Sequence, residues 1–334
     1  MLTRKLIEEK YTDKGLKPTT AKTYTTNLLS VIKRLTGETN TDVLQSDTSK
    51  WFNIEMFNEK FSKLKPTTIR NYISCVISWM LANNETCNPL FKELSNMRDT
   101  LHKTYEDGVA AGKSETEVAG WMEGSHIAKQ FESQIIPILN RYNLIHKSKP
   151  MSVKYSDVDN AEFLKIRDII IVSFYLIPFC EDSGNFGVLR NDITTFVYVP
   201  LKSNAKAFKE SKEFNSFITT PSTGRLSMVM YKTDSSHGAI SIPLPDIINT
   251  VFRKWAVFSQ VKVGTLLFPD LTRNAVSCIL LKYTKKYLGK SVSTQLLRKM
   301  YVTYRFSEDK NDRQEVANNM MHSTGVQDTI YNKG

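Results

Sequence analysis

The sequence predicts a mainly α-helical protein with a small antiparallel β-sheet, an α+β fold divided into two domains. Three observations support this prediction. The 334 residues are enough to form two hydrophobic cores. Apolar residues recur at helical spacing along most of the chain, and the alternating period of strands replaces it only between residues 193 and 244. A softer segment with Gly108, Gly112 and Ser114 marks the junction, so we expect domains at residues 1–113 and 114–334.

The first domain contains two copies of one helix start. Leu16–Tyr24 reads Leu-Lys-Pro-Thr-Thr-Ala-Lys-Thr-Tyr, and Leu64–Tyr72 reads Leu-Lys-Pro-Thr-Thr-Ile-Arg-Asn-Tyr. Proline is tolerated in a first helical turn, and we expect the threonine pair to cap exposed amides. Both starts place Lys or Arg beside Tyr, and helix N-termini attract phosphate. Either copy alone is also compatible with an ordinary capped helix. A further helix is expected from Pro89 to about Ala111.

The second domain is expected to begin and end with helices that enclose the sheet. Helical patterns cover residues 115–139, 161–179, 246–258, 271–288, a stretch starting near Ser293, 312–321 and a last segment through Tyr331. The stretch 169–179 is too short to span a bilayer, and we interpret it as a buried helix. Strands are expected at 193–199, 226–232 and 239–244, the last two forming a hairpin. Between the first two strands we interpret Lys202, Lys206 and Lys209 as a solvated helical face or loop.

The composition favours a polyanionic partner. Lys and Arg number 45 against 34 Asp and Glu, which gives a net charge of +11 and a pI near 9.3. Such an excess suits nucleic acid, although an ordinary basic globular protein has the same composition. The four cysteines are scattered without metal-ligand spacing, and no signal peptide opens the chain. We therefore expect an intracellular protein, in cytoplasm or nucleus depending on the host, that is neither secreted nor bound to a membrane.

The end of the chain offers the groups that phosphodiester transfer requires. That reaction needs a nucleophile, cations on the non-bridging oxygens and a proton for the leaving oxygen. Ser-Thr-Gln-Leu-Leu-Arg-Lys contains Arg298, and Met-Met-His-Ser-Thr-Gly-Val-Gln-Asp-Thr-Ile-Tyr contains His322 and, nine residues later, Tyr331. Upstream, Gly-Val-Leu-Arg-Asn-Asp-Ile contains Arg190, and Met-Tyr-Lys-Thr contains Lys232 at a predicted strand end.

The order and spacing of these residues resemble the tyrosine recombinases, the phage-integrase family that cuts DNA through a phosphotyrosine. The Leu-Arg-Asn-Asp run looks like the box of recombinases from large eukaryotic DNA viruses and related mobile elements. The resemblance implies that Tyr331 attacks the scissile phosphate, that Arg190, Arg298 and His322 bind it, and that Lys232 protonates the 5′ leaving oxygen.

The chain departs from the family pattern at two of these boxes. Gln295 stands where the family has His or Lys, so the proton relay there is in doubt, and Lys299 is a substitute only if its side chain turns inward. Met321 stands where many relatives have Gly.

The resemblance also implies how the two domains act. A helical, SAM-like core-binding domain and a tyrosine-recombinase catalytic domain would clamp duplex DNA. The DNA-binding candidates are the polar and aromatic residues of the two echoed helix starts and a basic stripe before Arg298: Lys17, Thr19, Lys22, Tyr24, Lys65, Thr67, Arg70, Tyr72, Lys282 and Lys286. The stripe, which also includes Lys285 and Lys290, is equally compatible with a solvated surface.

The implied partners are double-stranded DNA and further copies of the chain. Family members act as homotetramers on paired sites, and we expect the free protein to be mainly monomeric. No metal or cofactor is expected, because the phosphotyrosine conserves the bond energy. Two alternatives remain open: a type IB topoisomerase, which reseals the same strand, and a DNA-binding relative that has lost catalysis. The repeated helix starts favour the recombinase over the first, and the full set of candidate residues argues against the second, which Gln295 keeps open.

Overall fold

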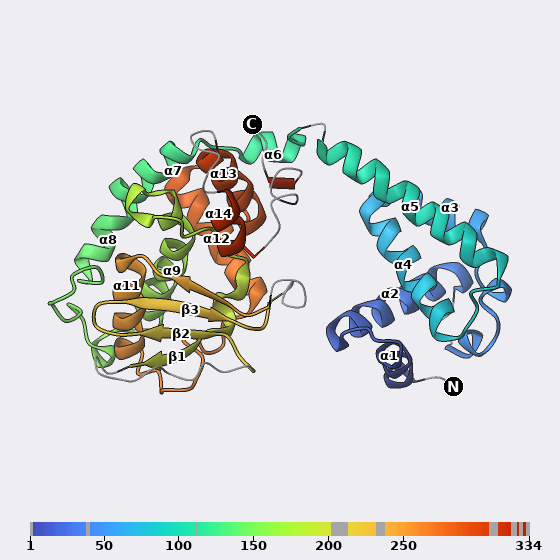
Figure 1. The fold of residues 1–334 in the computed structure, drawn as a ribbon, viewed down its shortest axis with the longest axis horizontal. Coiled ribbons are helices and arrows are strands. Elements are labelled where there is room, and N and C mark those ends of the chain that lie inside the picture. Colours follow the sequence, from blue (N-terminus) through green and yellow to red (C-terminus); the bar gives the residue numbers. More distant parts are fainter. Residues whose placement is uncertain are drawn as a thin grey trace. The chain divides into compact units, whose positions relative to one another are not determined.

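The computed structural model describes residues 3–37, 41–110, 112–201, 213–231, 238–306, 313–321, 326, 330 and 331. The chain forms two compact units, Met1–Ala111 and Gly112–Gly334 (Figure 1). Helices predominate and the strands belong to one small sheet, so the predicted fold class is confirmed. Among the described residues, no helix combines the length and the apolar character needed to cross a membrane.

The first unit is helical throughout its described part. Its helices are α1 (Arg4–Asp13), α2 (Pro18–Thr36), α3 (Ile54–Phe61), α4 (Pro66–Ala82) and α5 (Pro89–Ala110), with short 3₁₀ turns η1 (Thr41–Gln45) and η2 (Thr48–Lys50). Helices α1, α2 and α4 contact one another, and α5 packs along α4. Aromatic rings fill the centre: Trp79 is fully buried, and the rings of Phe57 and Phe61 stack with centroids 4.3 Å apart. This core holds the two echoed helices in place.

The two echoed helices begin alike, but not with the expected threonine caps. Both start at the predicted proline, and the preceding Lys17 and Lys65 are the N-cap residues with nearly equal backbone angles (φ −58°, ψ 142° and φ −62°, ψ 142°). Neither N-cap makes a side-chain capping bond. Because proline occupies the first helical position, the threonines fall inside the first turn, where a side chain cannot serve as the N-cap.

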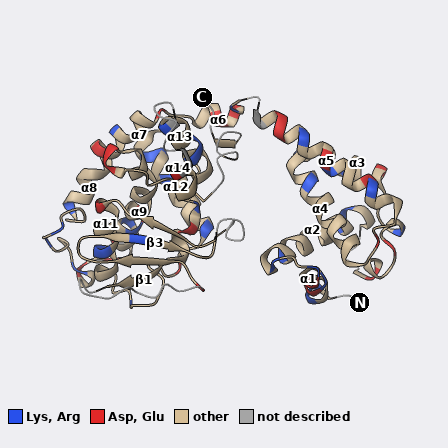
Figure 2. Cartoon of the chain, viewed as in Figure 1, with Lys and Arg blue, Asp and Glu red and all other residues tan. Residues whose placement is uncertain are grey.

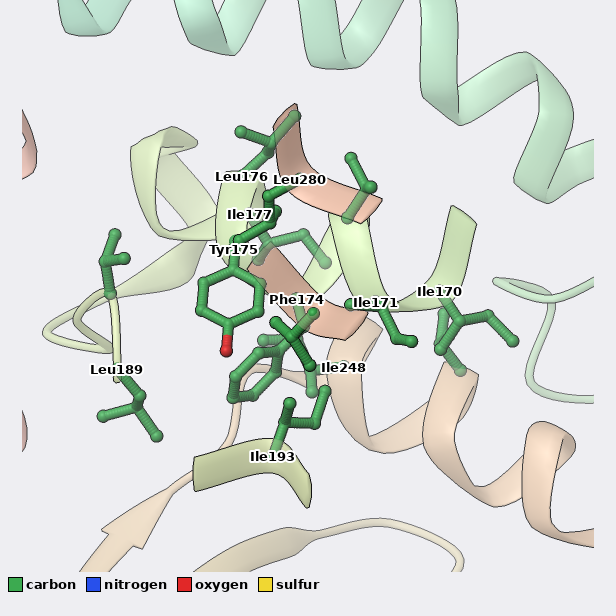
Figure 3. Close-up of a cluster of buried hydrophobic side chains, with 14 of the residues drawn as sticks. Ile170, Ile171, Phe174, Tyr175, Leu176, Ile177, Leu189, Ile193, Ile248 and Leu280 are labelled. Carbon is green, nitrogen blue, oxygen red and sulfur yellow. The ribbon is translucent and has the colours of Figure 1, made fainter. Parts of the chain in front are cut away.

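The second unit surrounds one buried helix. Its helices are α6 (Glu115–Gly120), α7 (Gly124–Gln130), α8 (Ile136–Arg141), α9 (Asn160–Leu176), α11 (Asp246–Phe258), α12 (Arg273–Leu288), α13 (Thr294–Phe306) and α14 (Arg313–Asn319). Shorter turns are η3 (Phe131–Ile135), η4 (Tyr155–Asp157), η5 (Ile177–Phe179), η6 (Glu181–Ser183) and η7 (Asn191–Thr195). Helix α9 contacts both α11 and α12. Its apolar side chains, including Ile170 and Phe174, lie among Ile193 of η7, Ile248 of α11 and Leu280 of α12 (Figure 3).

The helix predicted over residues 115–139 is interrupted, contrary to expectation. The backbone is extended at Trp121 and Glu123, between α6 and α7. The flanking glycines lie against α13: a Cβ on Gly120 would come within 2.6 Å of Leu296, and one on Gly124 within 2.2 Å of Tyr304. Further on, η3 is a π-helical turn that ends just before Pro137, whose missing N–H removes one α-helical hydrogen bond.

The sheet has four strands and mixed pairing, whereas three antiparallel strands were expected. Strands β1 (Val197–Pro200), β2 (Ser216–Thr219), β3 (Gly224–Met228) and β4 (Ile240–Pro243) lie in that order (Figure 1). β1 and β2 are parallel, and the other two pairs are antiparallel, so the expected final hairpin is present. β2 was missed because its four residues are all buried and show no alternation. η7 occupies the start of the first predicted strand.

Some sequence expectations fall on residues outside those described. Lys202, Lys206 and Lys209 belong to this group, as do Lys232 and His322. β3 ends at Met228, before the predicted strand end at residue 232.

The close approach of α7 to α13 gives a stability prediction. Gly124→Ala should lower the free energy of unfolding by about 1–3 kcal/mol, because the new methyl group overlaps the Tyr304 ring. Gly108→Ala in α5 is the matched helical control. No atom lies within 4 Å of its added Cβ, so that change should raise the unfolding free energy by about 0.5–1 kcal/mol. Denaturant titration of both variants measures the difference, and equal effects would contradict the packing argument.

Candidate active site

Arg298 is the buried centre of the candidate site. It projects from α13, is 2% exposed, and donates from Nη1 to the Val188 carbonyl (2.6 Å) and from Nη2 to the Met320 carbonyl (2.9 Å). Its Nε donates to the Tyr331 hydroxyl over 3.4 Å, and its Cζ lies 5.0 Å from the centroid of that ring. One guanidinium therefore joins the segment before Arg190, the end of α14 and the candidate nucleophile.

Tyr331 lies in a cationic pocket although it is nearly buried. Its side chain is 7% exposed, and its carbonyl accepts a bond of 3.4 Å from Thr303. Burial by itself raises the pKa of the Tyr331 phenol. The neighbouring Arg298 and Arg190 outweigh that effect, so the pKa lies below its ordinary value of 10.0. The surroundings thus favour the phenolate, which is the attacking form of a tyrosine nucleophile.

Arg190, the residue immediately before η7, is the second cation of the site. It is half-buried, and its Nη1 donates to the Met321 carbonyl over 3.4 Å, while its own carbonyl accepts from the Tyr175 hydroxyl at 3.0 Å. Met321 has a left-handed backbone (φ 59°), which glycine adopts with less strain. The structure therefore brings together Arg190, Arg298 and Tyr331.

Asp192 is a member of this neighbourhood that the sequence reasoning did not select. It is 2% exposed, and its Oδ1 accepts from Arg273 Nη2 at 3.0 Å. Burial raises the pKa of this carboxyl, against the opposing effects of Arg273, Arg190 and Arg298. Oδ2 is buried without a hydrogen-bond partner. The signal available in the sequence was a carboxylate two residues after Arg190.

The cluster as a whole carries excess positive charge. Among the described residues, neither Arg190 nor Arg298 forms an ion pair with a carboxylate. Asn191 fixes the local backbone, since its amide donates to Ser277 (2.9 Å) and accepts from Thr294 (2.6 Å), which links η7, α12 and α13. Buried cations without a counter-ion are costly, so the arrangement favours an incoming anion.

Two candidates of the sequence analysis, Lys232 and His322, lie outside the described residues. The segment that leads to Lys232 is nevertheless well fixed. The side chain of Asn215 accepts from the amides of Val229 and Met230, both at 2.8 Å, and donates to the Met230 carbonyl at 2.7 Å. The Tyr231 hydroxyl donates to the Gly238 carbonyl at 2.5 Å.

Gln295 and Lys299, the two polar neighbours of Arg298 on α13, form no hydrogen bond with Arg190, Arg298 or Tyr331. Gln295 is exposed. Lys299 is buried and forms an ion pair with Glu117, whose other oxygen accepts from the Ser114 amide. The ammonium of Lys299 is therefore held by the first helix of this unit.

The DNA-binding candidates of the echoed helix starts differ in accessibility. Lys17, Thr19, Lys22 and Lys65 are exposed, and Thr67, Arg70, Tyr24 and Tyr72 are half-buried. The two tyrosines pack on the core, Tyr24 against Tyr11 and Tyr72 against Phe61. Arg70 contacts His102 Nδ1 at 3.0 Å and lies over the Tyr105 ring.

The basic stripe on α12 divides into two pairs. Lys285 donates to the Gly289 carbonyl (3.1 Å) and Lys290 to that of Trp121 (2.7 Å). Lys282 and Lys286 stay exposed, with their ammonium groups 5.1 and 5.0 Å from the centroids of the Tyr283 and Tyr287 rings. Lys282 and Lys286 are four residues apart and so lie on one helical face, and Lys285 is exposed as well.

Comparison of the chain with protein-family models and with curated proteins finds no match. In the part of the chain that the structure describes, no group of three or more His, Cys, Asp or Glu residues is placed to hold a metal ion.

The cationic surroundings of Tyr331 lead to a titration experiment. The native protein should contain a phenol that ionises below pH 10.0 and that is missing from Tyr331→Phe. Arg190→Gln should raise the pKa of Tyr331, because burial persists while one opposing charge is lost. Absorbance difference titration measures both, with the exposed Lys129→Gln as control. An unchanged pKa in Arg190→Gln would argue against the contact.

The ion pair between Glu117 and Lys299 gives a pH-dependent stability. Burial raises the pKa of Glu117, but the bonds from Lys299 and Ser114 prevail, and the pKa lies below 4.5. The contribution of the pair is therefore present above pH 4.5 and is lost as the pH falls through the lower folded value. Glu117→Gln should cost about 2 kcal/mol at neutral pH and progressively less in acid. Denaturant titration across this range tests it, with the exposed Glu115→Gln as a control that should be nearly neutral.

Proposed function

We propose that the protein is a DNA strand transferase of the tyrosine recombinase type, which cuts and rejoins DNA through a 3′-phosphotyrosine. The observation that carries the proposal is the contact between the buried Arg298 and the Tyr331 hydroxyl, with Arg190 beside it. A phenol of lowered pKa next to two guanidiniums suits attack on a phosphate. The same cations would then neutralise the charge that develops on the non-bridging oxygens.

The donor geometry of Arg298 supports the binding of a phosphate. A guanidinium has five N–H groups, and three of those on Arg298 donate to Val188, Met320 and Tyr331. The remaining donors and those of Arg190 suit a tetrahedral oxyanion. In the proposed reaction the Tyr331 phenol loses its proton to solvent, and the phenolate oxygen bonds to phosphorus while the bond between phosphorus and the 5′ oxygen breaks. The 5′ oxygen leaves with a proton, for which Lys232 is the candidate donor. A 5′ hydroxyl of the partner duplex reverses the step and releases the tyrosine.

The two units would divide the work on DNA. The exposed Lys17, Lys22 and Lys65 of the first unit and Lys282 and Lys286 of the second are suited to bind phosphates of a duplex. The proposal includes a tetramer on paired sites and a mainly monomeric free protein.

The direct test is covalent attachment. The protein is incubated with duplex DNA from the region flanking its gene, interrupted in one strand so that cleavage is trapped, and adducts are resolved under denaturing conditions. Tyr331→Phe should give no adduct while DNA binding stays within about twofold, because the change removes one oxygen and no charge. Arg190→Ala should slow adduct formation on the order of 10²-fold, whereas Arg141→Ala should not. Adducts that persist in Tyr331→Phe would place the nucleophile elsewhere.

The alternatives predict other outcomes of the same assays. A type IB topoisomerase would form the adduct and relax a supercoiled circle without exchanging strands between two duplexes. A binding protein without catalysis would retard the DNA without any adduct.

A further inference from the structure

A cavity of about 720 Å³ lies in the second unit, apart from the candidate active site. The loop that follows α8, strand β1, the end of β2 and helix α11 line it. In Figure 1, α11 and β1 lie at the opposite end of the unit from α13 and α14. Neither Arg190, Arg298 nor Tyr331 belongs to the lining. Cavities that bind small ligands usually measure roughly 300–1,000 Å³, so this one has the size for an organic ligand.

The lining of the cavity is strongly basic. It contains Lys147, Lys149, Lys154, Arg253 and Lys254, and none of the described residues that line it is Asp or Glu. Figure 2 shows basic positions in α11 and in the loop after α8. Lys147 pairs with Asp246 outside the lining at 2.6 Å. Lys149 and Lys154 are exposed, and their ammonium groups form no ion pair or hydrogen bond with the described part of the chain. The cavity therefore offers two uncompensated charges to an anion.

The walls of the cavity are held in place by two other cations. Lys254 donates to the carbonyls of Asn143, His146 and Lys149, and thereby fixes the loop that carries Lys149. Arg253 donates to the Pro221 carbonyl at 2.8 Å. A loop fixed in this way loses little conformational entropy when a ligand binds.

The remaining wall is aromatic. Tyr198 and Phe258 are buried beneath the cavity, and Tyr155 stands 47% exposed with its ring edge-on to Phe258 at 6.1 Å between centroids. An exposed ring beside fixed cations suits a ligand with a planar face and several negative charges.

We propose that this cavity binds a nucleotide, with its phosphates on Lys149 and Lys154 and its base against Tyr155. The bases of an intact duplex are stacked inside the helix and cannot reach an aromatic wall in a cavity. The nucleotide is therefore either free or the unstacked end of a single strand. The proposal does not depend on the phosphotyrosine chemistry, since the cavity shares no residue with that site.

The test is calorimetric titration of the full chain with ATP, inorganic triphosphate and a short 5′-phosphorylated oligothymidylate. ATP should bind at least about fivefold more tightly than triphosphate, because its base stacks on the ring. Tyr155→Ala should remove that difference and leave triphosphate affinity unchanged. The double variant Lys149→Gln, Lys154→Gln should weaken ATP about tenfold or more. The control Lys129→Gln, Lys262→Gln has the same charge change on exposed residues outside the cavity, and it should stay within about twofold of the wild type.

The results distinguish a free nucleotide from the end of a single strand, and they also show whether the cavity binds neither. Tighter ATP binding identifies a free nucleotide, and tighter oligothymidylate binding that ATP displaces identifies a strand end. No binding of either probe at low salt would overturn the proposal. So would equal losses in the two double variants, or full affinity in Lys149→Gln, Lys154→Gln. Tyr331→Phe should bind the probes normally, so a failure of the strand-transfer proposal is read independently of this one.

Discussion

The hydrogen bonds of the buried Arg298 guanidinium hold together the part of the second unit that contains the candidate site. A side chain that is 2% exposed and permanently charged must satisfy its donors inside the protein. It does so by joining segments that are distant in sequence: Val188 before η7, Met320 after α14, and Tyr331 near the end of the chain. The same contacts close the core and place the tyrosine, so the stability of this region and the geometry of the candidate site depend on one residue.

Other charged side chains surround that guanidinium. Arg190 adds a second cation, and Asp192 balances part of the field through its bond to Arg273. Asn191 ties the turn that carries both residues to α12 and α13. Removing water from such a cluster strengthens its interaction with an anion, because screening in the interior is weak. The arrangement therefore combines a fixed backbone with excess positive charge.

Much of the fold was predictable from local patterns, and the exceptions have physical causes. The prolines located α2 and α4, Gly289 ended α12 with a left-handed backbone (φ 78°), and the apolar run located α9. The short strand β2 was not predictable, since a strand buried on both faces has no alternation. The gap between α6 and α7 depends on contacts of Gly120 and Gly124 with α13, which no local pattern encodes. For the site, residue types and order selected Arg190, Arg298 and Tyr331. The capture of Lys299 by Glu117 and the burial of Asp192 are tertiary facts.

The first helix of the second unit, α6, is attached to α13, the helix that carries Arg298. Ser114 begins α6 with a capping box, Glu117 of that box holds Lys299, and Gly120 lies against Leu296. Lys299 and Leu296 flank Arg298 on α13. A substitution that disturbs α6 would therefore bear on the turn of α13 that carries Arg298.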